Sequence, residues 1–237
     1  MRSEKNLTES KKNFITVGGC HIVGYGIEGN PSFVEIIESN LNYKCTLKKS
    51  HFQIKNVEKL IEILEEENTD FVVLQLGNFE FFTKLKPNHS SSSSSSSSSN
   101  EVITALKHDF YEGKNKLYRL ALYLTKVIFT PFYWVYIKNQ TKDSLQKLRA
   151  EIQKKPEKLF VIITPLPCYR SANNIIRKKS ASYFWNFFDL SNVVFVNSHK
   201  SIPIKKEMFF NEGHLGVKGH QQLGNDISKM ISEYYKS

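Results

Sequence analysis

The sequence predicts an α/β protein of three layers, in which helices cover both faces of a five-stranded, doubly wound parallel sheet. Three observations support this fold class: short apolar runs recur along the chain, segments with helical apolar spacing separate them, and several runs end at glycine or proline. The chain has 237 residues, of which 40% are apolar and 13% aromatic, so it can bury one sizeable core. We therefore expect a single domain over residues 1–237.

The five predicted strands are short runs rich in apolar and β-branched residues. They lie at residues 14–17, within 43–54, and at 71–76, 159–164 and 192–196. The second is weak, with Cys45, Leu47 and Phe52 as its apolar positions, whereas 71–76 and 159–164 are continuous apolar runs typical of strands buried on both faces. Right-handed crossovers in a doubly wound order place the ends of the first and third strands side by side, where ligands of α/β proteins bind.

Helices are expected at residues 32–40, 57–67, 141–154, 171–190 and 216–234, where apolar residues recur at helical spacing. Asn30 followed by Pro31 predicts the N-cap and the first helical position of the first of these helices. Residues 141–154 are typical of an exposed amphipathic helix, and residues 216–234 form the closing helix.

The segment 117–137 is the most apolar part of the chain. It is long enough to cross a membrane, but Arg119, Lys126 and the mid-segment Pro131 argue against a span. We expect a core-facing helix that breaks at Pro131. The alternative is a segment lying on a membrane surface, a peripheral contact through 117–137 with aromatic residues at the headgroup level: Tyr118, Tyr123, Trp134 and Tyr136.

A serine tract interrupts the chain in the region 88–100. Such a sequence cannot bury apolar area, so it predicts a flexible insert. Because strands and helices alternate again after it, we do not expect it to separate two domains.

Composition also limits the class of partner and the compartment. The formal charge is +10, but the lysines and arginines are dispersed in pairs without interleaved aromatic residues, so we expect no nucleic-acid partner. Cys20, Cys45 and Cys168 form no C-x-x-C pair, which predicts neither a disulfide framework nor a metal site, and we expect no cofactor. The first residues lack the apolar stretch of a secretory signal, so the expected location is cytoplasmic.

Two residues near opposite ends of the chain carry the candidate chemistry. Cys20 ends the first strand, where the amides of the following loop could lower the pKa of its thiol toward a reactive thiolate. The alternative is that Cys20 is a small apolar residue closing the strand. His214 lies in a glycine-rich loop before the last helix, and either Asn211 or Glu212 could accept from its ring and orient it.

Three stretches around these residues resemble the sequence blocks of the SGNH (GDSL-type) hydrolases. Residues 18–24 read GGCHIVG and resemble the first block, G-D-S-x-x-x-G. Residues 72–80 read VVLQLGNFE and resemble the third block, a strand ending in G-x-N-D. Residues 211–215 read NEGHL and resemble the last block, D-x-x-H, with GHQQL following at 219–223. The blocks occur in the family's order and spacing over nearly the whole chain.

The resemblance implies a flavodoxin-like SGNH hydrolase fold, with Cys20, His214 and Asn211 as the catalytic residues. It also implies that the oxyanion and substrate are bound by residues of the same loops: Gly19, Gly77, Asn78 and Glu212. The chain departs from the family pattern at several positions. Cys20 replaces the serine, Gly19 and Asn211 replace aspartates, Asn78 comes one place early, and no glycine marks the second block between Cys45 and Val57.

The residues together predict an esterase or acyltransferase. A cysteine depends less than a serine on an aspartate, because a thiolate–imidazolium pair can form before substrate arrives and Cys-His-Asn triads work on another fold. Cys20 would attack the carbonyl of a small acyl ester of a carbohydrate or lipid alcohol, the substrate class that the resemblance implies, and the Cys20 amide and Asn78 would hold the oxyanion. The alternative is a catalytically inactive domain of this fold that binds a saccharide or a protein.

Overall fold

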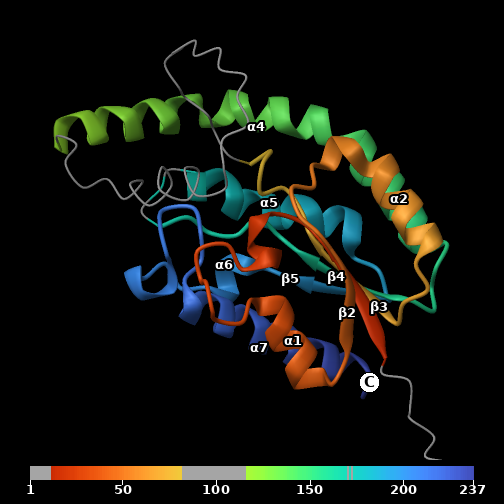
Figure 1. The fold of residues 1–237 in the computed structure, drawn as a ribbon. Helices are drawn as coiled ribbons and strands as arrows, with labels where there is room; N and C mark the ends of the chain where they lie inside the picture. The colour runs from red at the N-terminus through yellow and green to blue at the C-terminus, as the bar shows by residue number, and fades with distance from the viewer. Residues whose placement is uncertain (1–11, 82–115, 170, 172) are drawn as a thin grey trace, which may run out of the picture.

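The computed structural model describes residues 12–81, 116–169, 171 and 173–237 and shows a five-stranded parallel sheet in the order β2-β1-β3-β4-β5 (Figure 1). The strands are β1 (Asn13–Val17), β2 (Lys44–Lys49), β3 (Phe71–Gln75), β4 (Leu159–Ile163) and β5 (Val193–Val196). The five predicted strands and their doubly wound order are confirmed. The serine tract at 88–100 lies outside the described residues.

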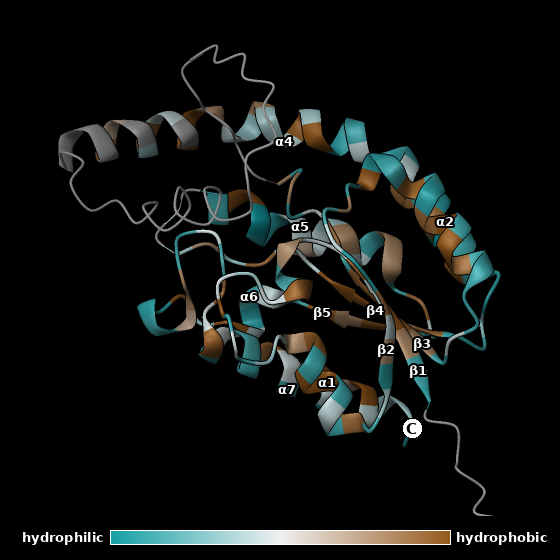
Figure 2. Ribbon diagram, viewed as in Figure 1, coloured by the Kyte–Doolittle hydropathy of each residue, from teal (hydrophilic) through white to brown (hydrophobic). Residues whose placement is uncertain are grey.

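Helices cover both faces of the sheet, as the sequence predicts (Figure 1). On one face lie α1 (Phe33–Leu41) and α7 (Val217–Tyr234), and on the other lie α2 (Val57–Glu66), α4 (Lys116–Gln153) and α5 (Asn173–Phe188). Short helices occupy the connections: η1 (Cys20–Val23), η2 (Ile54–Asn56), α6 (Ser198–Ser201) and η3 (Lys206–Met208). Every residue of β3 and β4 is buried, and these central strands are coloured as hydrophobic in Figure 2.

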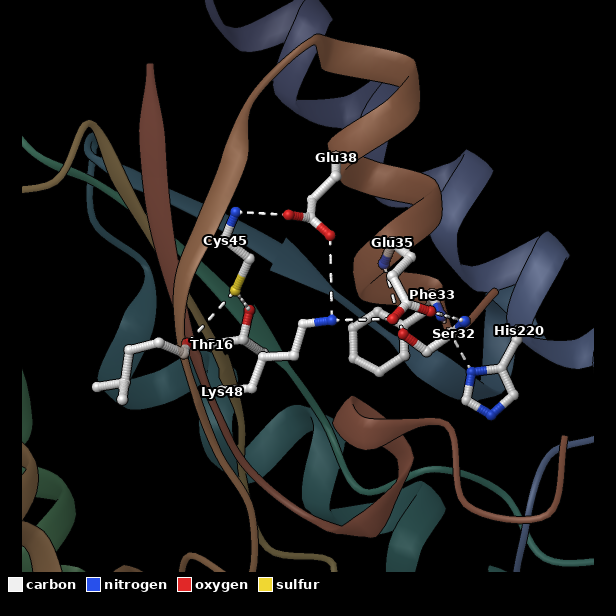
Figure 3. A network of polar contacts seen from close by, with 9 residues as sticks. Thr16, Ser32, Phe33, Glu35, Glu38, Cys45, Lys48 and His220 are labelled. Carbon is white, nitrogen blue, oxygen red and sulfur yellow. Dashed lines mark hydrogen bonds and ion pairs between the residues drawn. The ribbon is translucent and has the colours of Figure 1, made fainter. Parts of the chain in front are cut away.

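Helix α1 begins at Phe33, two residues after Pro31, the predicted first helical position. Its N-cap is Ser32, whose hydroxyl accepts from the Glu35 amide while the Glu35 carboxylate accepts from the Ser32 amide at 2.7 Å (Figure 3). This reciprocal capping box satisfies two amides at once, which Asn30 does not do because its side chain donates to the Glu28 carbonyl instead. The prediction of Asn30 as N-cap and Pro31 as the first helical residue is therefore wrong.

A polar network ties the edge strand β2 to α1 (Figure 3). The Glu38 carboxylate accepts from the Cys45 amide at 2.8 Å, and the Lys48 ammonium lies 3.1 Å from Glu35 and 4.0 Å from Glu38. The residues of β2 alternate between exposed and half-buried over most of the strand, so β2 buries little apolar surface of its own. The polar contacts with α1 help to hold it on the sheet. Phe52, expected on this strand, lies beyond its end at Lys49.

Helix α4 differs most from the sequence-based expectation. It runs without interruption from Lys116 to Gln153 through Pro131, so the predicted break and the predicted separate helix at 141–154 are wrong. Its C-terminal part packs on the sheet through Leu145, Leu148 and Ile152, whereas its N-terminal part is largely exposed and not core-facing. Proline removes one main-chain donor, and in an exposed helix water can satisfy the carbonyl that this donor would have met.

A membrane-spanning helix is not found among the described helices, since none combines the necessary length with sufficient apolar character.

Candidate active site

The loop after β1 packs unusually close to the end of β3. The Gly19 amide donates to the Gln75 side-chain oxygen at 3.0 Å, and a Cβ atom on Gly18 would lie only 2.5 Å from the Gln75 Cβ. Only a residue without a side chain therefore fits at Gly18. This approach fixes the start of η1 and places Cys20 at the carboxyl edge of the sheet.

Cys20 meets His214 there, although the two are 194 residues apart in sequence. His214 Nε2 lies 3.0 Å from Cys20 Sγ, and His214 Nδ1 lies 2.9 Å from Asn211 Oδ1. Because a carbonyl oxygen can only accept, Nδ1 carries the ring proton and Nε2 presents its lone pair to the thiol. The three side chains are thus arranged for a proton to pass from Cys20 to His214.

Asn211 holds the loop as well as the ring. Its side-chain oxygen also accepts from the main-chain amides of Gly213 and His214, each at 2.9 Å, and Asn211 is 3% exposed. The amides of Gly213 and His214 can only donate, so the Asn211 atom that they share must be its side-chain oxygen. The same oxygen therefore faces the His214 ring. Glu212, the other candidate for orienting His214, lies next in the loop, where its carbonyl accepts from the Tyr169 amide at 2.7 Å.

Burial controls the protonation state of Cys20. It raises the pKa of the Cys20 thiol to about 11, and this outweighs the lowering by the Cys20 amide, the Arg177 charge and the His21 amide. The expectation that loop amides bring this thiol toward a thiolate is therefore wrong: they act in the expected direction but are overcome by desolvation. The raised pKa favours the neutral thiol, and this thiol faces a histidine nitrogen.

Two further histidines lie near Cys20 and His214. The His21 ring lies 5.3 Å from the His214 ring, and His21 Nδ1 is 3.9 Å from Cys20 Sγ. Burial lowers the pKa of His21, and burial also lowers the pKa of His220 to about 4, so both are neutral near pH 7. His220 Nδ1 accepts from the Phe33 amide at 3.1 Å, which gives this residue a structural role at the start of α1.

Asn78 supplies a candidate donor for an oxyanion. Its side-chain oxygen accepts from the Leu166 amide at 2.9 Å, while its side-chain nitrogen is buried and has no hydrogen-bond partner among the described residues. A Cβ atom on Gly19 would lie 2.7 Å from that nitrogen, so the donor lies directly against the Gly19–Cys20 segment. Gly77, with φ +76°, makes the turn that presents Asn78.

Sequence analysis missed two residues that shape these loops. The buried Arg177 donates to the carbonyls of Asn78, Phe81 and Leu166, and so ties the loop after β3 to the loop after β4. Its sequence context, RKK in a helical segment, resembles a solvated face and gives no signal of burial. His51, between Cys45 and Val57, adopts the left-handed φ of +62°, so the chain turns at this position without a glycine.

Within the described parts of the chain, no three side chains of histidine, cysteine, aspartate or glutamate are grouped so as to hold a metal ion.

The raised pKa predicts how Cys20 alkylation depends on pH. Iodoacetamide reacts with the thiolate, so its rate at Cys20 should be low at pH 7 and rise about tenfold per pH unit toward a midpoint near pH 11. Mass spectrometry of the alkylated peptides gives the rate at each cysteine, and Cys20→Ser identifies the Cys20 signal. A rate independent of pH between pH 6 and 9 would instead reveal a preformed thiolate–imidazolium pair.

Comparison with known proteins gives structural matches alone. No protein-family model matches the chain, and no curated protein sequence matches it. Among solved structures, the fold is similar to an acetylxylan esterase from Geobacillus stearothermophilus, with 12% identity, 94% of each chain covered and a TM-score of 0.56. It is also similar to a family two carbohydrate esterase from Clostridium thermocellum, with 13% identity, 94% of this chain and 63% of that chain covered and a TM-score of 0.55. At these identities the likeness establishes the fold: the chain has the α/β architecture of these esterases.

Proposed function

We propose that the protein is an SGNH-like esterase or acyltransferase that uses Cys20 as its nucleophile and His214 as its general acid and base. The observation that carries this proposal is the line of contacts from Cys20 Sγ through both ring nitrogens of His214 to Asn211 Oδ1, with distances of 3.0 and 2.9 Å. The shared fold of the carbohydrate esterases and the block resemblance support it.

The chemistry follows from these positions. His214 Nε2 removes the thiol proton as Sγ forms a bond to the ester carbonyl carbon, and the carbonyl electron pair moves to the oxygen. The Cys20 amide and the Asn78 side-chain nitrogen donate to this oxyanion. As the tetrahedral intermediate collapses, the C–O bond breaks and His214 returns the proton to the leaving alcohol. A water or a second hydroxyl, deprotonated by His214, then takes the acyl group from the thioester.

The neutral resting pair makes Asn211 a workable substitute for aspartate. In serine proteases, exchanging the orienting aspartate for asparagine lowers kcat about 10⁴-fold, because the histidine adopts the wrong tautomer. Here the Gly213 and His214 amides hold the Asn211 oxygen toward the ring, so the correct tautomer is retained. Replacing aspartate by asparagine does remove the negative charge that would stabilise the imidazolium during attack. A cysteine depends less on this counter-charge than a serine, because a thiol is more acidic than an alcohol.

The comparisons support a small acyl ester of a carbohydrate as substrate, within the wider class of carbohydrate and lipid alcohols. The Geobacillus protein is described as an acetylxylan esterase, and its catalytic mutants replace a serine, an aspartate and a histidine by alanine. That aspartate and that histidine stand three positions apart, as Asn211 and His214 do. Cys20, Asn211 and His214 would occupy the corresponding roles.

The proposal predicts turnover of a generic acetyl ester. The protein should hydrolyse 4-nitrophenyl acetate, and Cys20→Ala and His214→Ala should each lower kcat/KM by about 10²- to 10⁴-fold, because general acid–base and nucleophilic steps contribute on this scale. Release of nitrophenolate is the measurement, with unfolding midpoints confirming that the variants fold. Turnover unchanged in Cys20→Ala would eliminate the cysteine mechanism. No turnover by the folded wild-type protein, combined with saccharide binding, would favour the inactive binding domain.

A double-variant cycle tests whether the cysteine and the asparagine act together. Cys20→Ser should lose most activity, since a serine beside an uncharged Asn211 lacks a counter-charge for the imidazolium. Adding Asn211→Asp should recover about tenfold or more in the serine background and less in the cysteine background, giving a coupling energy measurable from kcat/KM. Equal effects of Asn211→Asp in both backgrounds would show that the two positions act independently.

The position of Asn78 predicts a role in kcat and not in KM. Gly19→Ala would place a Cβ atom 2.7 Å from the Asn78 side-chain nitrogen and displace this donor, so kcat should fall about 10²-fold, as for loss of one oxyanion donor. Asn78→Ala should have a similar effect. Gly213→Ala is the matched control, because its added methyl group would lie at an ordinary contact distance of 3.9 Å from Asn211 Oδ1 and the variant keeps the Gly213 amide that donates to this oxygen. Full activity in Gly19→Ala would rule out this donor.

A further inference from the structure

The N-terminal part of α4 exposes an apolar surface that the proposed reaction does not explain. Phe132 is 74% exposed and Ile128 65%, whereas the core residues of the same helix, such as Leu145 and Ile152, are fully buried. We name this surface the α4 ridge; its exposed apolar members are Leu120, Tyr123, Leu124, Val127, Ile128, Phe129, Phe132, Val135 and Tyr136. A cluster of this many exposed, large apolar side chains is typical of a surface that binds a protein or a membrane.

The spacing of these residues makes one continuous surface. Exposed apolar residues occur at every fourth position from 120 to 136, and residues four apart lie one above the other on an α-helix. Val127 and Val135 widen this row on one side. The surface therefore runs along five turns of the helix, which suits a flat partner better than a small pocket-bound ligand.

The helix is anchored on its other side. The Tyr133 hydroxyl donates to the Glu80 carbonyl at 3.1 Å, the Trp134 ring packs 5.9 Å from Phe81, and Ile137 is buried. Beyond these anchors the N-terminal part of α4 extends past the sheet (Figure 1). The ridge is thus held rigidly on the body while its apolar side faces outward.

Charge indicates the kind of partner. Between residues 114 and 142 the sequence has six basic residues and no acidic one: Lys114, Lys116, Arg119, Lys126, Lys138 and Lys142. The whole chain carries a formal charge of +10. An apolar surface with aromatic residues and a surrounding excess of lysine and arginine is complementary to an anionic lipid surface. A second copy of the chain would bring like charges together, which opposes self-association.

We propose that the α4 ridge lies on an anionic membrane surface, with its apolar side chains among the lipid acyl chains near the headgroups, and that the positive charge of the chain attracts it to this surface. The helix would lie along the bilayer without crossing it. The docking does not depend on whether Cys20 is a nucleophile.

Vesicle flotation with the full chain tests the proposal. The wild-type protein should float with vesicles of phosphatidylcholine containing about one third phosphatidylserine at low salt, and bind phosphatidylcholine alone much more weakly. Raising the salt should weaken the binding, because it screens the attraction between the cations and the headgroups. Phe132→Asp should weaken the partition constant about tenfold or more, since a fully buried phenylalanine contributes on that scale.

The matched control is Ile204→Asp, which places the same charge on a different exposed apolar residue, 46% exposed. It should leave vesicle binding unchanged, and both variants should keep the wild-type unfolding midpoint and acetyl-ester turnover. The proposal is overturned if the wild-type protein does not float with anionic vesicles at low salt, or if Phe132→Asp and Ile204→Asp bind equally. A dimer in solution that Phe132→Asp converts to a monomer, without vesicle binding, would assign the ridge to a second copy and also overturn it.

Discussion

The parallel pairing of β1 with β3 is the constraint on which the candidate site depends. The register sets Val17 beside Leu74, so Gly18 and Gly19 meet Gln75 as both strands end. Gln75 then fixes the Gly19 amide on one side, and the Gly77 turn presents Asn78 on the other. Because parallel strands end at the same edge, the pairing of β1 with β3 brings the candidate nucleophile and the candidate oxyanion donor to one place.

The departures from the family pattern compensate for one another in space. The residue after the first glycine is an aspartate in the family and Gly19 here, and the third-block asparagine comes one place early as Asn78. A side chain at position 19 would collide with the Asn78 amide nitrogen, so the missing side chain leaves the room that the displaced asparagine occupies. Likewise the third departure, Asn211, is fixed in the useful orientation by two main-chain amides. Changes that look independent along the sequence are coupled in the fold.

The sequence predicted what depends on local pattern and topology. Apolar runs located all five strands, and their order predicted that Cys20 and the third-block loop share one edge. The contact of Cys20 with His214 was expected only from the resemblance of the sequence blocks, since no local pattern links residues 194 apart. The start of α1 was mispredicted because two local capping signals, Asn30-Pro31 and Ser32 with Glu35, stand side by side, and the reciprocal capping box of the second satisfies two amides at once.

Other properties depend on packing that no local pattern encodes. Arg177 lies in a basic run that resembles a solvated surface, yet it is buried and bridges two loops. Apolar composition predicted a buried helix at 117–137, but burial also requires a neighbouring surface, and the body provides one only from about Tyr133 onward. Pro131 did not break α4, since the residues around it are largely exposed and water can satisfy the carbonyl that lacks its donor.

Burial of Cys20 favours a neutral thiol at this site over a permanent thiolate. A permanent thiolate would react with oxidants and electrophiles in the absence of substrate, since both reactions follow thiolate character. In the proposed reaction, with the pKa raised to about 11, the thiol stays protonated until His214 accepts its proton during attack. The imidazolium then forms only during attack, and because a thiol gives up its proton more readily than an alcohol, this transfer depends less on a counter-charge at position 211. Desolvation of the sulfur and loss of the aspartate are therefore mutually consistent features of one neutral proton-transfer pair.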